Sequence, residues 1–282
     1  SRVKALIFHK IGTVIVNGTD NILISMFFGV VTVGLYSNYF TVINAIHVLF
    51  GQAITSLTAS IGNLLVQKNV EKNFQVFKRL RFANFWIATF SGTALFVVMQ
   101  PFICVWVGEK YLLSNFVLFV LVFNYYQKMM RNCYGTFKDS AGIWREDKFV
   151  PLIESVLNIF ASLVCLKIFG LAGVFIGTII SGFALWMYSY PKFVYKKIFH
   201  RTYLNYAKET IGYLLLFLVI SFFTFSLSNM ITVSNLYLKL FINIFLSVTI
   251  PNILIFLCFR KTSNFQYFLN LFKNIIVRKK HA

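Results

Sequence analysis

Long apolar runs separated by short basic segments are the feature that most restricts how this chain can fold. A bilayer core requires about 20 apolar residues for each crossing helix. The runs that reach this length are 11–32, 37–65, 82–105, 113–136, 149–168, 171–190, 210–229 and 236–258. Only 12% of the residues are charged, against about 25% in a soluble domain. We therefore predict an all-α integral membrane protein, a polytopic bundle of about eight transmembrane helices.

The net charge of +19 comes from basic residues that gather on one side of the predicted membrane. All Lys and Arg except Lys110, Lys167 and Lys239 fall in the N-terminal segment, the alternate connections or the C-terminal tail. Cytoplasmic connections of membrane proteins are enriched in Lys and Arg, so we predict that both termini lie in the cytoplasm. This distribution is a topology signal, and it argues against nucleic acid as a partner.

The polar stretch NGTDN, residues 17–21, interrupts the first apolar run. A loop there would break the alternation of basic connections, so we predict one uninterrupted helix through it. Asn17 and Asn21 then lie one turn apart on one stripe, with Asp20 beside them. An ionisable group inside a membrane is costly and should face a cavity or a partner. For the asparagines, hydrogen bonding between helices is an equally good interpretation.

Further polar residues mark the second, fourth and fifth runs. Gln52 and Ser56 lie one turn apart and form a second stripe. Lys128, Arg131 and Lys138 form a basic stripe at the end of the fourth run, which suits a phosphate or pyrophosphate. An ordinary basic connection explains that stripe equally well. Glu154 could pair with Arg131 or Lys138 or take up a proton, and pairing is the simpler expectation.

Two segments and one motif concern the architecture. Residues 69–82 and 264–280 have apolar and basic residues on opposite helix faces, which predicts surface helices anchored on anionic lipid at the inner leaflet. Gly173, Gly177 and Ser181 follow each other at four-residue spacing, which predicts close packing against a neighbouring helix.

Motifs of known catalytic chemistry are missing from the sequence. It contains no GxxxxGK[ST], HExxH or GxSxG pattern, and its four cysteines lack metal-binding spacing. We predict no enzymatic activity, no metal and no cofactor.

Four stretches resemble one known family, in the same order along the chain. They are HKIGTVIVNGTDNILISMFFGVVTVGLYSNY (9–39), FICVWVGEKYLLS (102–114), YGTFKDSAGIWREDKFVPLIESVLN (134–158) and GLAGVFIGTIIS (170–181). Together they resemble the C-terminal half of Wzx-type polysaccharide flippases, members of the MOP superfamily that are related to MATE transporters.

The resemblance implies a transporter of two six-helix lobes around a central cavity. Residues 1–198 would form the C-terminal lobe, and residues 199–282 would add two transmembrane helices and a basic cytoplasmic tail. The chain would then be a fragment, a half-transporter that works beside a separate N-lobe polypeptide or polysaccharide-assembly proteins, or an inactive truncated remnant.

The resemblance also implies a cargo and a place in the cell. The cargo would be a polyprenyl-pyrophosphate-linked oligosaccharide, moved from the inner to the outer leaflet of the bacterial cytoplasmic membrane with the help of a cation gradient. Two alternatives are a MATE-like small-molecule exporter and an envelope polysaccharide polymerase. The candidate cavity residues are Asp20, Asn17, Asn21, Gln52, Ser56, Arg131 and Lys138, and the candidates for cation coupling are Asp20 and Glu154.

Overall fold

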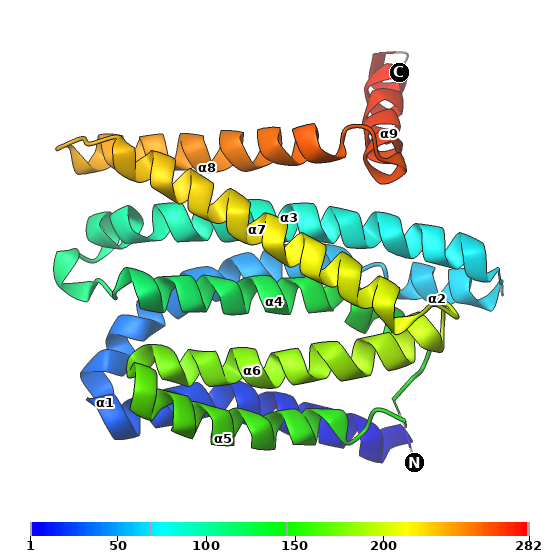
Figure 1. The fold of residues 1–282 in the computed structure, drawn as a ribbon, viewed down its shortest axis with the longest axis horizontal. Coiled ribbons are helices and arrows are strands. Elements are labelled where there is room, and N and C mark those ends of the chain that lie inside the picture. The colour runs from blue at the N-terminus through cyan, green and yellow to red at the C-terminus, as the bar shows by residue number, and fades with distance from the viewer. Residues whose placement is uncertain (1, 68, 145, 281–282) are drawn as a thin grey trace.

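The chain folds into a bundle of long helices that lie side by side, with one helix turned away from them (Figure 1). The computed structural model describes residues 2–67, 69–144 and 146–280, with side chains from Gly18 to Asn274 except at 68, 145, 185 and 272. The described helices are α1 (Arg2–Thr55), α2 (Thr58–Val66), α3 (Val70–Trp106), η1 (Glu109–Tyr111), α4 (Asn115–Ser140), α5 (Val150–Phe169), α6 (Leu171–Tyr190), η2 (Pro191–Lys196), α7 (Tyr203–Met230), α8 (Leu236–Phe259) and α9 (Ser263–Lys280).

The predicted all-α membrane bundle of about eight crossings is confirmed. Helix α1 bends at Gly29, whose φ of 82° and ψ of 164° leave the helical region in a way that glycine tolerates. The two limbs of α1 are the first two predicted crossings, and the first limb runs through residues 17–21 without a break, as predicted. In the described part of the chain, six segments are long and apolar enough to cross a membrane, with Gly18–Val66 counted as one. Helix α4 matches them in length but carries more charge.

The connections divide between two ends of the bundle. The N-terminus and the α2–α3, α4–α5, α6–α7 and α8–α9 connections lie at one end, which we call the basic end (Figure 1). The Gly29 bend, η1 and the α5–α6 turn lie at the opposite end. Most Lys and Arg follow this division as predicted, but Lys128 and Arg131 lie inside α4 and not in a connection. The assignment of the basic end to the cytoplasm stays a prediction.

The prediction of a separate surface helix at 69–82 is wrong. These residues begin α3, a continuous helix of 37 residues whose first N–H groups are capped by the Asn69 side chain. Its apolar face turns inward, because Phe74 and Phe77 pack against Phe199 with ring centroids 5.3 and 4.9 Å apart. The predicted C-terminal helix does exist as α9, which runs across the axes of the bundle (Figure 1). Its contact with lipid stays a prediction.

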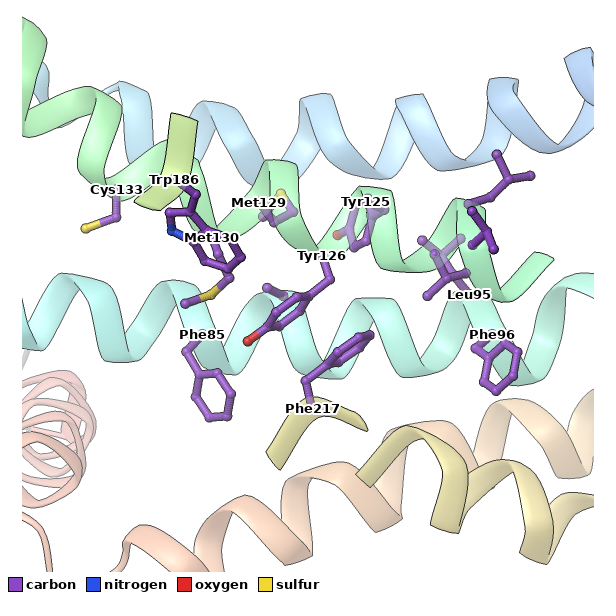
Figure 2. Packing of buried hydrophobic residues seen from close by; sticks show 14 of the residues in the cluster. Phe85, Leu95, Phe96, Tyr125, Tyr126, Met129, Met130, Cys133, Trp186 and Phe217 are labelled. Atoms are coloured by element: carbon purple, nitrogen blue, oxygen red, sulfur yellow. The ribbon is translucent and has the colours of Figure 1, made fainter. Parts of the chain in front are cut away.

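The bundle core places α4 at the centre of the molecule. Figure 2 shows Tyr126 of α4 facing Phe217 of α7, with Phe85 of α3 nearby. The rings of Tyr126 and Phe217 stack with centroids 3.9 Å apart. This packing fixes one face of α4 and so orients the other face toward α1. The division of the chain at residue 198 stays a prediction.

Helices α5 and α6 form a hairpin in which the two backbones touch. A Cβ atom on Gly173 would lie 2.1 Å from the Cys165 carbonyl oxygen, and one on Gly177 would lie 2.3 Å from the Ser162 backbone nitrogen. Real Cβ atoms do not approach backbone this closely, so only glycine fits here. The predicted close packing of the small-residue motif is confirmed.

Replacing Gly177 with alanine should therefore force α5 and α6 apart. Overpacking typically costs about 1–3 kcal/mol, which lowers the melting temperature of a chain this size by roughly 2–10 °C. Thermal unfolding in detergent measures the effect. Gly62→Ala is the matched control, because a Cβ on Gly62 meets no atom within 4 Å. Equal melting temperatures for the two variants would contradict the packing described for the hairpin.

Candidate functional site

A cavity of about 620 Å³ lies between α1, α2, α4, α5 and α6. It extends from the second turn of α6, at Phe175, past Asp20 of α1 toward the basic end, at Thr58 and Asp139. Its wall combines aromatic rings, asparagines and threonines with a few charged groups. The charged residues on its wall are Asp20, Lys128, Arg131, Asp139 and Glu154.

The cation of Arg131 is occupied by a carboxylate from a neighbouring helix. Its Nη1 and Nη2 donate to the two oxygens of Glu154 at 2.7 and 3.1 Å, and its Nε lies 3.5 Å from the Tyr190 hydroxyl. The predicted pairing of Glu154 is thus observed. Two parallel bonds of this kind are the strongest arrangement that an arginine and a carboxylate can make. Arg131 and Glu154 therefore line the cavity together as a neutral ion pair.

Lys138 is also neutralised, but it is not part of the cavity wall. The loop after α4 folds back and brings Asp147, which is fully buried, into an ion pair with the Lys138 ammonium. The second oxygen of Asp147 accepts a hydrogen bond from Ser189 at 3.0 Å. The prediction that Lys138 lines the cavity and contacts the substrate is therefore wrong in this structure. Its ammonium belongs to a buried ion pair between α4, the loop and α6.

Lys128, the first residue of the predicted basic stripe, lies on the cavity wall together with Arg131. It lies about midway along α4 and is partly buried. Asp20, Arg131 and Glu154 act on it electrostatically. In the part of the chain that the structure describes, its ammonium makes no hydrogen bond or ion pair. Lys128 is therefore a free cation at membrane depth.

A stripe along α4 explains how Lys128 reaches the cavity. Asn124, Lys128, Asn132 and Thr136 all line it, at four-residue spacing. Residues four apart share one helix face, so this spacing was visible in the sequence. The basic stripe predicted at the end of the fourth run includes Lys128 but none of its polar neighbours on this face. Asn124, Asn132 and Thr136 were the missed signal.

Asp20 lies deep in the bundle and belongs to a small polar cluster. It is 8% exposed and accepts a hydrogen bond from the Thr178 hydroxyl at 3.1 Å. The same hydroxyl accepts from the Asn158 amide at 2.9 Å, while the Oδ1 of Asn158 is buried without a partner. Asn158 of α5, Thr178 of α6 and Asp20 of α1 are thus joined in one chain of hydrogen bonds. The close α5–α6 hairpin makes this possible, since Gly177 precedes Thr178.

The remaining predicted residues lie elsewhere. Asn21, Gln52 and Ser56 are exposed and do not line the cavity. On the second limb of α1, the face that lines the cavity includes His47. At about 100° per residue, Gln52 lies about 140° around the helix from His47. The side chain of Asn17 lies outside the described residues. Within the described chain, no group of three or more His, Cys, Asp and Glu side chains could hold a metal ion.

The fold of the chain is similar to that of one known transport protein. No family model and no curated protein matches the chain. Among solved structures, it is similar to the lipid II flippase MurJ in an inward closed conformation, with a TM-score of 0.64 and 12% identity. The match covers 91% of this chain and 52% of that one, so the chain spans about half the length of MurJ. The chain therefore shares the fold of the part of MurJ that it matches.

At 12% identity the likeness extends to the fold alone, and the relation to Wzx-type proteins and to the MOP superfamily stays a prediction. Among the described residues, the wall of the cavity carries one unpaired cation, Lys128.

Proposed function

We propose that this chain is the C-terminal-lobe part of a flippase for lipid-linked oligosaccharide. The cargo is a polyprenyl-pyrophosphate-linked repeat unit, carried from the inner to the outer leaflet of the bacterial cytoplasmic membrane, with both termini of the chain in the cytoplasm. The observation that carries the proposal is the free Lys128 ammonium inside a cavity at membrane depth. Ionisable residues at such depth typically mark a substrate path.

The charges of the cavity suit a pyrophosphate group. A lysine ammonium is a compact charge with three donors, and an arginine guanidinium offers a planar fork that matches phosphate oxygens. A pyrophosphate bound to Lys128 reaches Arg131 by displacing Glu154, which holds the same fork at 2.7 and 3.1 Å. A free cation in mid-helix favours an anionic cargo over the cationic cargo of a small-molecule exporter.

A second lobe completes the path in this proposal. The chain spans about half of the MurJ structure. Asn21 and Gln52 of α1, and Ser56 in the turn after it, are polar and exposed within the apolar segment Gly18–Val66. Polar side chains avoid hydrocarbon, so these residues face the other lobe or the water between the lobes. In that position they contact the cargo only when both lobes are present.

Transport of a fluorescent polyprenyl-pyrophosphate-linked disaccharide across vesicle membranes tests the proposal. The protein is purified from its own membrane with any lobe that accompanies it. We expect the fluorescent head group to become accessible to an external quencher faster than in protein-free vesicles. Equal rates, together with export of a cationic dye by the same vesicles, would favour the small-molecule exporter instead.

Asp20 is the proposed site of the coupling cation. The Asp20 carboxylate, the Thr178 hydroxyl and the unpaired Asn158 oxygen are hard oxygen donors, as alkali and other hard cations prefer. Glu154, the other candidate, is already held by Arg131. It becomes available for a proton only when the cargo takes its place.

Replacing Asp20 with asparagine should remove the response to a cation gradient. The variant keeps the size of the side chain but loses the charge, so we expect gradient-driven transport to fall about tenfold or more, toward the rate without a gradient. The comparison uses the vesicle assay with and without a sodium or proton gradient. A variant that still responds fully to either gradient would remove Asp20 from the coupling site.

A further inference from the structure

Several polar groups on the cavity wall have no hydrogen-bond partner. The Nε2 atom of His47 and the Oδ1 atom of Asn124 are buried and unpaired. The Asn132 amide has only a contact to the Met129 sulfur at 3.7 Å. Asn44, which is exposed, also lines the cavity, and its amide makes no hydrogen bond within the described chain. Buried polar groups are normally paired, so the two buried atoms call for a ligand or for ordered water.

These groups surround the free cation. On α4, Asn124 lies one turn before Lys128 and Asn132 one turn after it. On α1, the His47 ring packs edge-on against the Tyr125 ring with centroids 6.2 Å apart. The charge of Lys128 acts on His47. The backbone leaves room for the Asn132 amide, because a Cβ on Gly51 would lie 3.2 Å from its nitrogen. The Asn124 amide nitrogen donates to the Phe175 carbonyl at 3.2 Å, which leaves its oxygen free toward this surface. The unsatisfied polar atoms and the cation therefore belong to one binding surface.

We infer that this surface is a sugar-binding subsite that selects the head group of the cargo. It consists of Asn44, His47, Asn124 and Asn132, and it binds hydroxyl groups of the sugar that is joined to the pyrophosphate at Lys128. This inference rests on the proposed function. An asparagine amide both donates and accepts, which matches a hydroxyl, whereas a phosphate can only accept at neutral pH.

The asparagine amides of the sugar-binding subsite carry no charge, which distinguishes this subsite from the pyrophosphate site at Lys128. A polyanion alone would leave the acceptor oxygens of Asn124 and Asn132 facing its negative charge. A sugar satisfies them with its hydroxyl protons. Sites built to bind hydroxyls discriminate strongly against ligands that lack them, because their own polar groups are then left unpaired. The subsite therefore determines specificity, and Lys128 determines that the cargo is an anion.

A binding measurement in lipid nanodiscs tests the inference with two probes. One is polyprenyl pyrophosphate, and the other is the same lipid carrying a disaccharide. The protein as purified should bind the disaccharide lipid about tenfold more tightly than the bare lipid, as expected for one or two additional hydrogen bonds. Asn132→Leu and Asn44→Leu should bring this ratio close to one while leaving affinity for the bare lipid unchanged.

The two residues are suitable because neither makes a conventional hydrogen bond that holds helices together. Retained affinity for the bare lipid shows that each variant is folded. Asn63→Leu is the matched control, since Asn63 is exposed on α2 and does not line the cavity; its ratio should stay near that of the unaltered protein. A ratio that persists in the Asn44/Asn132 double variant would overturn the subsite. An unaltered protein that binds neither lipid would overturn the proposed function itself.

Discussion

Replacing Lys128 with glutamine is expected to weaken the binding of polyprenyl pyrophosphate by roughly 100-fold. A hydrogen bond to a charged group contributes about 1.5–3 kcal/mol, and each 1.4 kcal/mol corresponds to a factor of ten in affinity. The loss should reach the upper end of that range, because the Asp20 and Glu154 carboxylates would remain near the site without the opposing ammonium. Titration of the lipid into nanodisc-embedded protein measures the change.

Two matched variants define what this result means. Lys128→Arg keeps the charge, so its affinity should stay within about fivefold of the original. Lys167→Gln makes the same change as Lys128→Gln at an exposed position on α5, near the opposite end of the bundle, and should leave affinity unaltered. If Lys128→Gln binds the lipid as tightly as Lys167→Gln, the cavity cation does not hold the pyrophosphate.

Replacing Glu154 with glutamine is expected to strengthen the same binding by about tenfold. The Glu154 carboxylate occupies the Arg131 fork that the pyrophosphate would otherwise use. Removing this internal competitor frees the guanidinium and also removes one negative charge from the wall, which together are worth one charged contact of roughly 1.5 kcal/mol. The lipid titration should therefore respond in the opposite direction to the Lys128 substitution.

Stability provides a second observation on the same variant. Breaking a partly buried ion pair leaves Arg131 without its counter-charge, so the ligand-free variant should melt at a lower temperature. Added lipid should restore the melting temperature, because a ligand that binds the folded state stabilises it. Glu146→Gln is the control, as Glu146 pairs with Lys197 in a half-exposed position. Weaker lipid binding by Glu154→Gln would show that Glu154 supports the site and does not compete with the cargo.

The architecture was largely predictable because a membrane leaves few choices. Backbone groups in hydrocarbon must bond within their own helix, so each long apolar run becomes a helix. This also explains why residues 17–21 stay helical although they are polar. The start of α3 was predicted less well. Its apolar face resembles that of a surface helix, and only tertiary contacts with Phe199 reveal that it packs against protein.

The site was predictable only in part, because pairing depends on contacts that are distant in sequence. Asp20 and Arg131 are conspicuous as ionisable residues near apolar runs, and both line the cavity. The partner of Lys138 could not be foreseen, since Asp147 reaches it through the fold of a loop. Gln52 has the spacing of a lining residue but the wrong phase around α1. Spacing identifies a helix face, whereas packing decides what that face meets.

The proximity of the Lys128 ammonium to the pyrophosphate is the most direct observation to make. Solid-state NMR can measure it as magnetisation transfer between ¹⁵N-labelled lysine side chains and the ³¹P nuclei of bound polyprenyl pyrophosphate. We expect one strong transfer, corresponding to about 4 Å or less for a charge-assisted hydrogen bond, that disappears in Lys128→Gln. Transfer that survives in Lys128→Gln would place the pyrophosphate on other lysines, such as those at the basic end, and would contradict the proposed cavity site.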